Sequence, residues 1–203
     1  ADLQRYCYFV AGAIGHLLTE AFVFEVSDLE PARARVLRSE AERFGIGLQL
    51  VNILRDIVSD LERDCCFVPR TTLQVAGLVP RDLVERSKER RAREALLPLF
   101  DMAQENLDAA FEYALAIPPA QAEIRNFCLV PLWLAVATLA LCRTDARLLD
   151  TSARVKLERA EVQRLVTRVI ALSKDDEALR KEYITLTGAQ PSQVPWRSEA
   201  SAL

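Results

Sequence analysis

Residues 44–69 of the chain read FGIGLQLVNILRDIVSDLERDCCFVP. If this segment is a helix, five polar side chains fall within an arc of about 80°, namely Gln49, Asn52, Asp56, Asp60 and Arg63. Leucine, isoleucine and valine occupy most of the remaining circumference. A surface helix has a broad polar face. The pattern therefore predicts a helix that is buried on most sides and carries one narrow polar stripe.

The two aspartates of this stripe suggest a metal site. Asp56 and Asp60 lie one helical turn apart, and two ionised carboxylates at that spacing repel each other. A divalent cation would relieve the repulsion, and Mg²⁺ prefers one or two carboxylates together with water and phosphate oxygens. Gln49 and Asn52 could hold those waters or phosphates. The stripe thus fits a magnesium–diphosphate site on a buried helix.

Two arginines accompany the stripe and allow a second interpretation. Arg55 and Arg63 could bind a diphosphate, because a guanidinium presents several donors to phosphate oxygens. They could equally form ordinary ion pairs, Asp56 with Arg63 and Asp60 with either arginine. The spacing of the residues leaves both interpretations open.

Composition indicates an all-α protein with a sizeable core. The chain has 203 residues, of which 51% are hydrophobic, and only 6 are glycine. That length suits a single domain. A formal charge of −3, with 26 basic and 29 acidic residues, gives no basic face of the kind that binds nucleic acid. We expect a domain over residues 1–187 and a flexible polar tail over residues 188–203.

Periodicity and breaker residues predict the remaining helices. Pro31 suits the first turn of a helix that extends to about Leu61. Glycines at 12, 15, 45 and 47 predict close helix contacts or a kink. Further helices are expected at about 2–24, 70–76, 91–116 and 121–142, from a cap at Thr151 to about Leu172, and from a capping box that begins at Ser173.

One apolar run and the cysteines bear on the cellular setting. Residues 127–142 form a run of 16 that includes Pro131, whereas a membrane span needs about 20 residues. We interpret the run as a buried core helix. The five cysteines contain no CxxC pair, which is typical of reduced thiols in a cytoplasmic protein.

Three ordered motifs resemble the squalene/phytoene synthase family, over residues 1 to about 143. NILRDIVSDLERDCCFVP is similar to the family's second aspartate-rich motif. RYCYFVAGAIG resembles its tyrosine-containing helix. IRNFCLVPLWLAVATLALC resembles a segment of the squalene-synthase branch. The resemblance implies a single-domain helical bundle of the isoprenoid-synthase type.

The family condenses two prenyl diphosphates head to head. The resemblance implies that Asp56 and Asp60 bind Mg²⁺, and that Gln49, Asn52, Arg55 and Arg63 help to hold diphosphate. Tyr6 matches a family tyrosine that acts in proton removal and in steering the carbocation. The alternative is a structural role, as a half-buried aromatic residue whose hydroxyl is hydrogen-bonded. Phe127 and its helix would wall a cavity for prenyl tails. Farnesyl diphosphate is the expected substrate, and squalene formation would also consume NADPH.

The sequence departs from the family pattern in several places, and Cys65 replaces a residue that is often basic. Asp64 stands where the family usually has glycine. The family's first aspartate-rich motif has no counterpart, so we expect a bundle that is truncated at its N-terminus and inactive alone. Phytoene formation from geranylgeranyl diphosphate, or a non-catalytic scaffold of the same fold, are the alternatives. Peripheral contact with a membrane during product release would suit both a squalene synthase and a phytoene synthase.

Overall fold

The regular elements of the described residues are all helical. The computed structural model describes residues 2–26 and 28–188. Its elements are α1 (Asp2–Cys7), the π-helical η1 (Tyr8–Gly12), α2 (Ala13–Glu25), α3 (Pro31–Arg55), α4 (Ile57–Leu61), α5 (Arg70–Val75), the 3₁₀ turns η2 (Pro80–Val84) and η3 (Arg86–Lys88), α6 (Glu89–Ala116), α7 (Ala122–Thr144), α8 (Arg159–Leu172) and α9 (Asp176–Thr187). The all-α prediction is confirmed.

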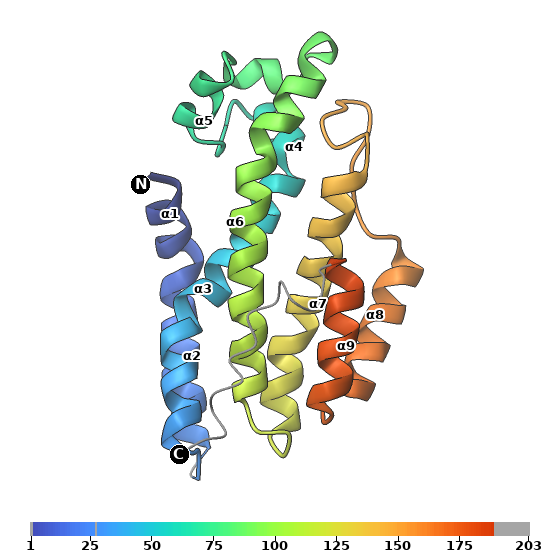
Figure 1. The fold of residues 1–203 in the computed structure, drawn as a ribbon. Coiled ribbons are helices and arrows are strands. Elements are labelled where there is room, and N and C mark those ends of the chain that lie inside the picture. Colours follow the sequence, from blue (N-terminus) through green and yellow to red (C-terminus); the bar gives the residue numbers. More distant parts are fainter. Residues whose placement is uncertain (1, 27, 189–203) are drawn as a thin grey trace.

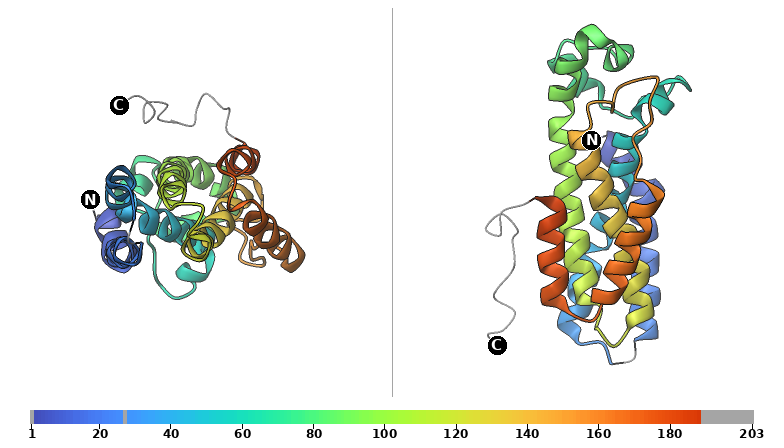
Figure 2. Two further views of the ribbon diagram at one scale, coloured as in Figure 1. Left: turned by 90° about the horizontal axis from the view of Figure 1, so that it is seen from below. Right: turned by 90° about the vertical axis from the view of Figure 1, so that its right-hand side faces the viewer.

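The long helices form an elongated bundle with α3 at its centre (Figure 1). Helix α3 contacts α6, α2 and α7, and the end-on view shows it between α2 on one side and α6 and α7 on the other (Figure 2). Helices α4 and α5 lie at the same end of the bundle as α1 (Figure 1). The aspartate-bearing end of α3 and the tyrosine-bearing α1 are therefore neighbours.

Glycines permit the close contact between the first helical stretch and α3, as the sequence predicted. A Cβ atom on Gly45 would collide with the carbonyl oxygen of Ala11, and one on Gly15 with that of Ala41. Each helical glycine costs about 1 kcal/mol relative to alanine. The two backbones touch here, so the glycines are explained by packing and not by a kink.

The predicted helix from Pro31 to Leu61 is interrupted. Asp56 leaves helical geometry, with φ −99° and ψ 10°, so that α3 ends at Arg55 and α4 begins at Ile57. The hydrogen bond from the Asp56 amide to the Asn52 carbonyl persists at 2.9 Å, and that from the Asp60 amide to the Asp56 carbonyl at 2.8 Å. The break therefore bends the helix but keeps the register of the stripe.

The expected helix start at Thr151 is wrong. The Asp150 carboxylate accepts hydrogen bonds from the amide and hydroxyl of Ser152 at 2.8 and 2.7 Å. Such side-chain bonds stabilise turns in competition with helix, and α8 begins only at Arg159.

The expected cap at Ser173 is also wrong. Its hydroxyl donates to the Ile170 carbonyl at 2.9 Å and so closes α8. Asp175 caps α9 instead, because its carboxylate accepts from the Ala178 amide at 3.0 Å.

The C-terminal helix is fixed to the core by aromatic and charged contacts. The Tyr183 ring stacks on Phe111 with centroids 4.3 Å apart, and the Tyr183 hydroxyl donates to Asp108 at 2.8 Å. The buried Arg125 of α7 pairs with Asp176. The expected polar tail lies, beyond Gly188, outside the described residues.

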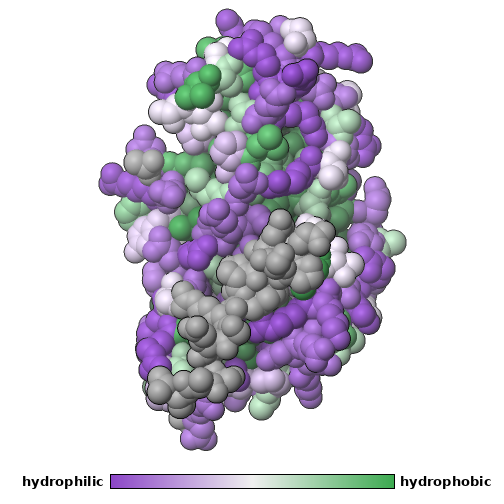
Figure 3. Space-filling view, viewed as in Figure 1, coloured by the Kyte–Doolittle hydropathy of each residue, from purple (hydrophilic) through white to green (hydrophobic). Residues whose placement is uncertain are grey.

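Two helical stretches have the length and composition of a membrane span, Asp2–Glu25 and Ala122–Thr144. Leu129, Leu132, Val136 and Leu139 of the second are at most 1% exposed, which is the packing expected of a core helix. The first is largely uncovered and carries exposed Phe9, Ile14, Leu17 and Phe24. The face shown in Figure 3 is mostly hydrophilic, with separate hydrophobic patches.

Candidate active site

The polar stripe is present at the bundle end formed by α3 and α4. Asn52 is exposed and Gln49 half-buried. The Asp56 side chain is 36% exposed and the Asp60 side chain only 13%. Flanking apolar residues, including Ile53 and Ile57, are buried at 3% and 4% exposure. The carboxylates thus become more enclosed toward α4.

Each stripe aspartate is held by a guanidinium. Arg55 Nε and Nη2 donate to the two Asp56 oxygens at 2.8 and 2.6 Å, and the pairing raises the pKa of Arg55. Adjacent residues on a continuous helix do not face each other; the break at Asp56 makes the pairing possible. Arg63 Nη2 donates to Asp60 Oδ1 at 2.7 Å. The ion-pair interpretation is therefore realised, but Asp56 pairs with Arg55 and not with Arg63.

Tyr6 lies beside the enclosed end of this stripe. Its ring stacks on Phe67, with centroids 4.8 Å apart and planes inclined by 26°. Phe67 lines a small pocket together with Asp60, Ile53 and Ile57. The N-terminal helix α1 thus meets the segment from Ile53 to Phe67, although Asn52 and Asp56 are not among the residues of that pocket.

Phe127 lies far from the aspartates. It sits near the start of α7, where its ring contacts Phe22 at 6.0 Å and is 59% exposed. The opposite end of α7 is the one that approaches the stripe, because Cys142 is within electrostatic range of Arg55 and Asp56. Phe127 and Cys142 are separated by about 22 Å along the helix. Phe127 could contact only the remote end of a long ligand.

Two features of the loop after α4 bear on the site. The sequence indicated the first only through the unusual residue Asp64, and it did not predict the second. Asp64 has a positive φ of 57°, which explains why glycine suits this position. Glu62 accepts a hydrogen bond from Arg154 at 2.6 Å. That contact ties the segment before α8 to the end of the stripe, and its separation of 92 residues leaves no local sequence signal.

Asp56 and Asp60 are the candidate ligands for Mg²⁺. Residues 2–26 and 28–188 contain no group of three or more His, Cys, Asp or Glu that could hold a metal ion. A magnesium ion bound through two carboxylates, water and phosphate oxygens needs no such group. Asp56 and Asp60 fit that mode, provided that Arg55 and Arg63 turn from the carboxylates to the phosphates.

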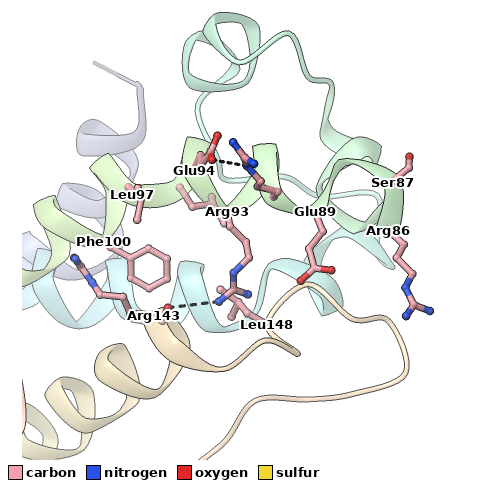
Figure 4. A pocket seen from close by; sticks show the side chains of 11 residues that line it. Arg86, Ser87, Glu89, Arg93, Glu94, Leu97, Phe100, Arg143 and Leu148 are labelled. Carbon is pink, nitrogen blue, oxygen red and sulfur yellow. Dashed lines mark hydrogen bonds and ion pairs between the residues drawn. The ribbon is translucent and has the colours of Figure 1, made fainter.

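A larger pocket lies elsewhere, between the first half of α6 and the end of α7 (Figure 4). Its volume is about 540 Å³. Two of its arginines are engaged in ion pairs: Arg90 with Glu94 at 3.0 Å, and Arg143 with Asp101 at 2.7 Å. Arg93 points toward the Arg143 carbonyl at the end of α7 (Figure 4). Size alone therefore does not identify the functional site.

Comparison with known proteins identifies the family. The model of the Squalene/phytoene synthase family matches residues 1–161, and the chain belongs to this family of head-to-head prenyl diphosphate condensing enzymes. Its matched region includes all three motifs and both stripe aspartates.

Individual relatives come from both branches of the family. A phytoene synthase from Pseudescherichia vulneris is 37% identical over 115 residues, covering 57% of this chain and 32% of that protein. A squalene synthase from Schizosaccharomyces pombe is 28% identical over 159 residues, covering 78% of this chain and 34% of that protein. The chain thus matches about a third of the length of these relatives.

Among solved structures, the complex of TcSQS with the ligand BPH1237 has a TM-score of 0.77 and 26% identity. The match covers 95% of this chain and 55% of that one. The complex with the ligand E5700 gives the same TM-score and covers 56% of its chain. The isoprenoid-synthase-type bundle expected from sequence is confirmed.

Proposed function

We propose that this chain provides one side of the active site of a prenyl transferase that joins two prenyl diphosphates head to head. Farnesyl diphosphate is the substrate we favour, with squalene or dehydrosqualene as product. The observation that carries the proposal is the pair Asp56 and Asp60. Asp56 lies at the junction of α3 and α4 and Asp60 within α4; both have buried apolar neighbours, yet each carboxylate is matched by a guanidinium, at 2.6 and 2.7 Å.

This arrangement can neutralise a diphosphate. Bound at Asp56 and Asp60, Mg²⁺ would supply positive charge to a departing diphosphate. Arg55 and Arg63 would then donate to the phosphate oxygens, as guanidinium groups do to oxyanions. Asn52 and Gln49, on the preceding turns of α3, would hold the outer phosphate or its water.

Tyr6 and Phe67 would act on the prenyl part of the substrate. Their stacked rings adjoin the pocket of Asp60, and an aromatic face stabilises a nearby cation. Loss of diphosphate would leave an allylic cation, to which the double bond of the second prenyl chain adds. Loss of a proton would then close the cyclopropyl product, whose own diphosphate leaves when it rearranges. We assign Tyr6 to steering that cation or accepting the released proton, while Phe127 would contact the far end of a prenyl tail.

Two alternatives remain. Phytoene synthase activity on geranylgeranyl diphosphate is favoured by the relative from Pseudescherichia vulneris. A non-catalytic scaffold would have no need of Asn52, Arg55, Asp56 and Asp60 together. Consumption of NADPH would accompany squalene but not phytoene or dehydrosqualene, so the cofactor requirement distinguishes squalene from the other two products.

The test is turnover by two proteins. The 203-residue chain is assayed alone, and also fused behind the N-terminal part of the squalene synthase from Schizosaccharomyces pombe, with farnesyl or geranylgeranyl diphosphate, Mg²⁺ and NADPH. We expect Mg²⁺-dependent pyrophosphate release from the fusion only, and its loss with Asp60→Ala. Full activity of the Asp60→Ala fusion would refute the assigned role, and full activity of the chain alone would refute the one-sided site.

A further inference from the structure

The pocket between the first half of α6 and the end of α7 has the size and the lining of a ligand site (Figure 4). Its volume of about 540 Å³ lies within the range of small-molecule pockets. Leu96, Phe100 and Leu148 form an apolar wall and are at most 3% exposed. Leu97 also lines the pocket and is 47% exposed. The pocket therefore offers a firm wall and an accessible leucine to the apolar part of a ligand.

Arg93 carries an unused donor to this pocket. Its side chain extends from α6 toward the end of α7 (Figure 4), where Nη2 lies 3.5 Å from the Arg143 carbonyl oxygen, a long distance for a hydrogen bond. Nη1 is buried and has no hydrogen-bond partner among the residues that the structure describes. Burying a cationic donor without an acceptor is unfavourable, so an oxygen atom supplied by a ligand would stabilise it.

The end of α7 explains only part of this arrangement. Cations are favourable near a helix C-terminus, where carbonyl groups lack helical partners, and Arg93 Nη2 meets such a carbonyl at Arg143. This structural role leaves Nη1 without an acceptor. Because the Nη2 contact is long, a small rotation of the guanidinium could turn Nη1 toward the pocket at little cost.

The charges of the lining favour an anion. Four arginines and two glutamates line the pocket, namely Arg86, Arg90, Arg93, Arg143, Glu89 and Glu94. Arg90 and Arg143 already form ion pairs, whereas Arg86 and Arg93 form none within residues 2–26 and 28–188. Glu94 is taken up by Arg90, so Glu89 is the opposing charge. Since Arg86 also acts on Asp150 outside the lining, Arg93 is the principal anion-binding group.

We propose that this pocket is a second ligand site, separate from the aspartate stripe, for a phosphate monoester with a small apolar group. None of the five stripe residues is among its described lining residues. The phosphate would accept hydrogen bonds from Arg93 and lie within the field of Arg86, because guanidinium groups bind phosphate oxygens through several donors. Three terminal oxygens can be shared between two arginines, which favours a phosphate over a carboxylate. The apolar group would pack against Leu97 and Phe100.

The experiment titrates the native 203-residue chain with phenyl phosphate, inorganic phosphate and benzoate, each up to about 10 mM so that weak binding is detected. EDTA is present throughout, because the proposed diphosphate site requires Mg²⁺ and the two sites are thereby measured apart. Calorimetry should show one site, at which phenyl phosphate binds at least about fivefold more tightly than inorganic phosphate, since its ring buries apolar surface. Benzoate should bind more weakly than phenyl phosphate. In methyl NMR spectra, phenyl phosphate should shift the signals of Leu97 and Leu148 but not those of Ile53 and Ile57 beside the stripe.

Matched variants identify the groups that bind. Arg93→Gln should weaken the binding of phenyl phosphate at least about tenfold, as loss of a charge-assisted hydrogen bond does, whereas Arg81→Gln, at an exposed arginine elsewhere, should leave it unchanged. Leu97→Asn should bring the affinity for phenyl phosphate close to that for inorganic phosphate. Circular dichroism confirms that each variant is folded.

Four results would each overturn the proposal. They are absence of binding, shifts of the Ile53 and Ile57 signals in place of those of Leu97 and Leu148, full binding by Arg93→Gln, and inorganic phosphate or benzoate that binds as tightly as phenyl phosphate.

Discussion

Tyr6 stacks on Phe67 with ring centroids 4.8 Å apart, although 60 positions separate the two residues in the sequence. Tyr6 belongs to α1 and Phe67 to the loop that follows α4. The contact therefore joins the tyrosine-containing motif to the second aspartate motif, at the pocket that includes Asp60.

A double-mutant cycle tests this stack. Tyr6→Leu and Phe67→Leu should each lower the free energy of unfolding, and the double variant should be less destabilised than the sum. We expect a coupling of about 0.5–1.5 kcal/mol, the range for aromatic pairs. Urea denaturation measures it, with Phe24→Leu as a control since that ring is 89% exposed. Strict additivity would contradict the stacking.

Because Gly45 lies against the backbone of Ala11, we expect that position 45 tolerates no side chain. Gly45→Ala gains helix propensity of about 1 kcal/mol, yet its Cβ would meet the Ala11 carbonyl. We expect a net loss of about 1–3 kcal/mol from the forced separation of the helices, measured by chemical denaturation. Arg35→Ala, on an exposed position of α3, should change stability by less than about 0.5 kcal/mol. A stabilised Gly45→Ala would contradict the packing.

The backbone of Asp64 predicts a stabilising substitution. Its φ is 57°, a conformation that costs most L-residues about 1–2 kcal/mol and aspartate somewhat less. Asp64→Gly should therefore raise the free energy of unfolding by about 0.5–1 kcal/mol. Ala76→Gly is the matched comparison, because Ala76 has a right-handed φ of −81° and should lose stability. Equal effects of the two substitutions would argue against the strained turn.

The hydrogen bonds of Asp145 predict that the stability of the protein depends on pH. Hydrogen bonds from the Arg147 side chain and backbone lower the pKa of Asp145 to about 2. A carboxylate with a lowered folded-state pKa stabilises the protein above its ordinary pKa of about 3.9, and this contribution is lost as pH falls from about 4 to about 2. Because Arg147 is exposed to solvent, we expect Asp145→Asn to cost only about 0.5–1 kcal/mol at pH 7.

Denaturation of both proteins from pH 7 down to pH 2 measures this effect. The stability difference between the native chain and Asp145→Asn should narrow below pH 4 and vanish near pH 2. Asp101→Asn offers a comparison at a more exposed carboxylate, whose side chain is 63% exposed. A difference that stays constant over the whole range would contradict the assigned pairing.

Periodicity was sufficient to predict most of the fold, because the apolar positions of α3, α6 and α7 face one continuous core. Pro31 begins α3 as predicted. The interruption at Asp56 could not be predicted, since the hydrogen bonds on either side of it are those of a helix. The segment before α8 is a loop because of local bonds at Asp150 and a remote one from Arg154 to Glu62.

The candidate site was only partly readable from sequence. The spacing of the stripe predicted that Asn52, Asp56 and Asp60 lie on one side of a helix. This prediction holds across the bend because the helical hydrogen bonds from Asp56 to Asn52 and from Asp60 to Asp56 are kept. The pairing of Arg55 with Asp56 required the bend, which no spacing rule includes. The position of Phe127, at the far end of α7, follows from the antiparallel course of α6 and α7 (Figure 1) and remains a prediction as a substrate contact.

The central claim, that Asp56 and Asp60 form a magnesium-dependent diphosphate site, is tested most directly by calorimetric titration of the 203-residue chain with pyrophosphate. We predict binding that requires Mg²⁺ and falls at least about tenfold in Asp56→Asn and in Asp60→Asn, while Asp101→Asn binds as the native chain does. Absence of binding, binding that is unchanged by removal of Mg²⁺, or full binding by the Asp56→Asn and Asp60→Asn variants would contradict the claim.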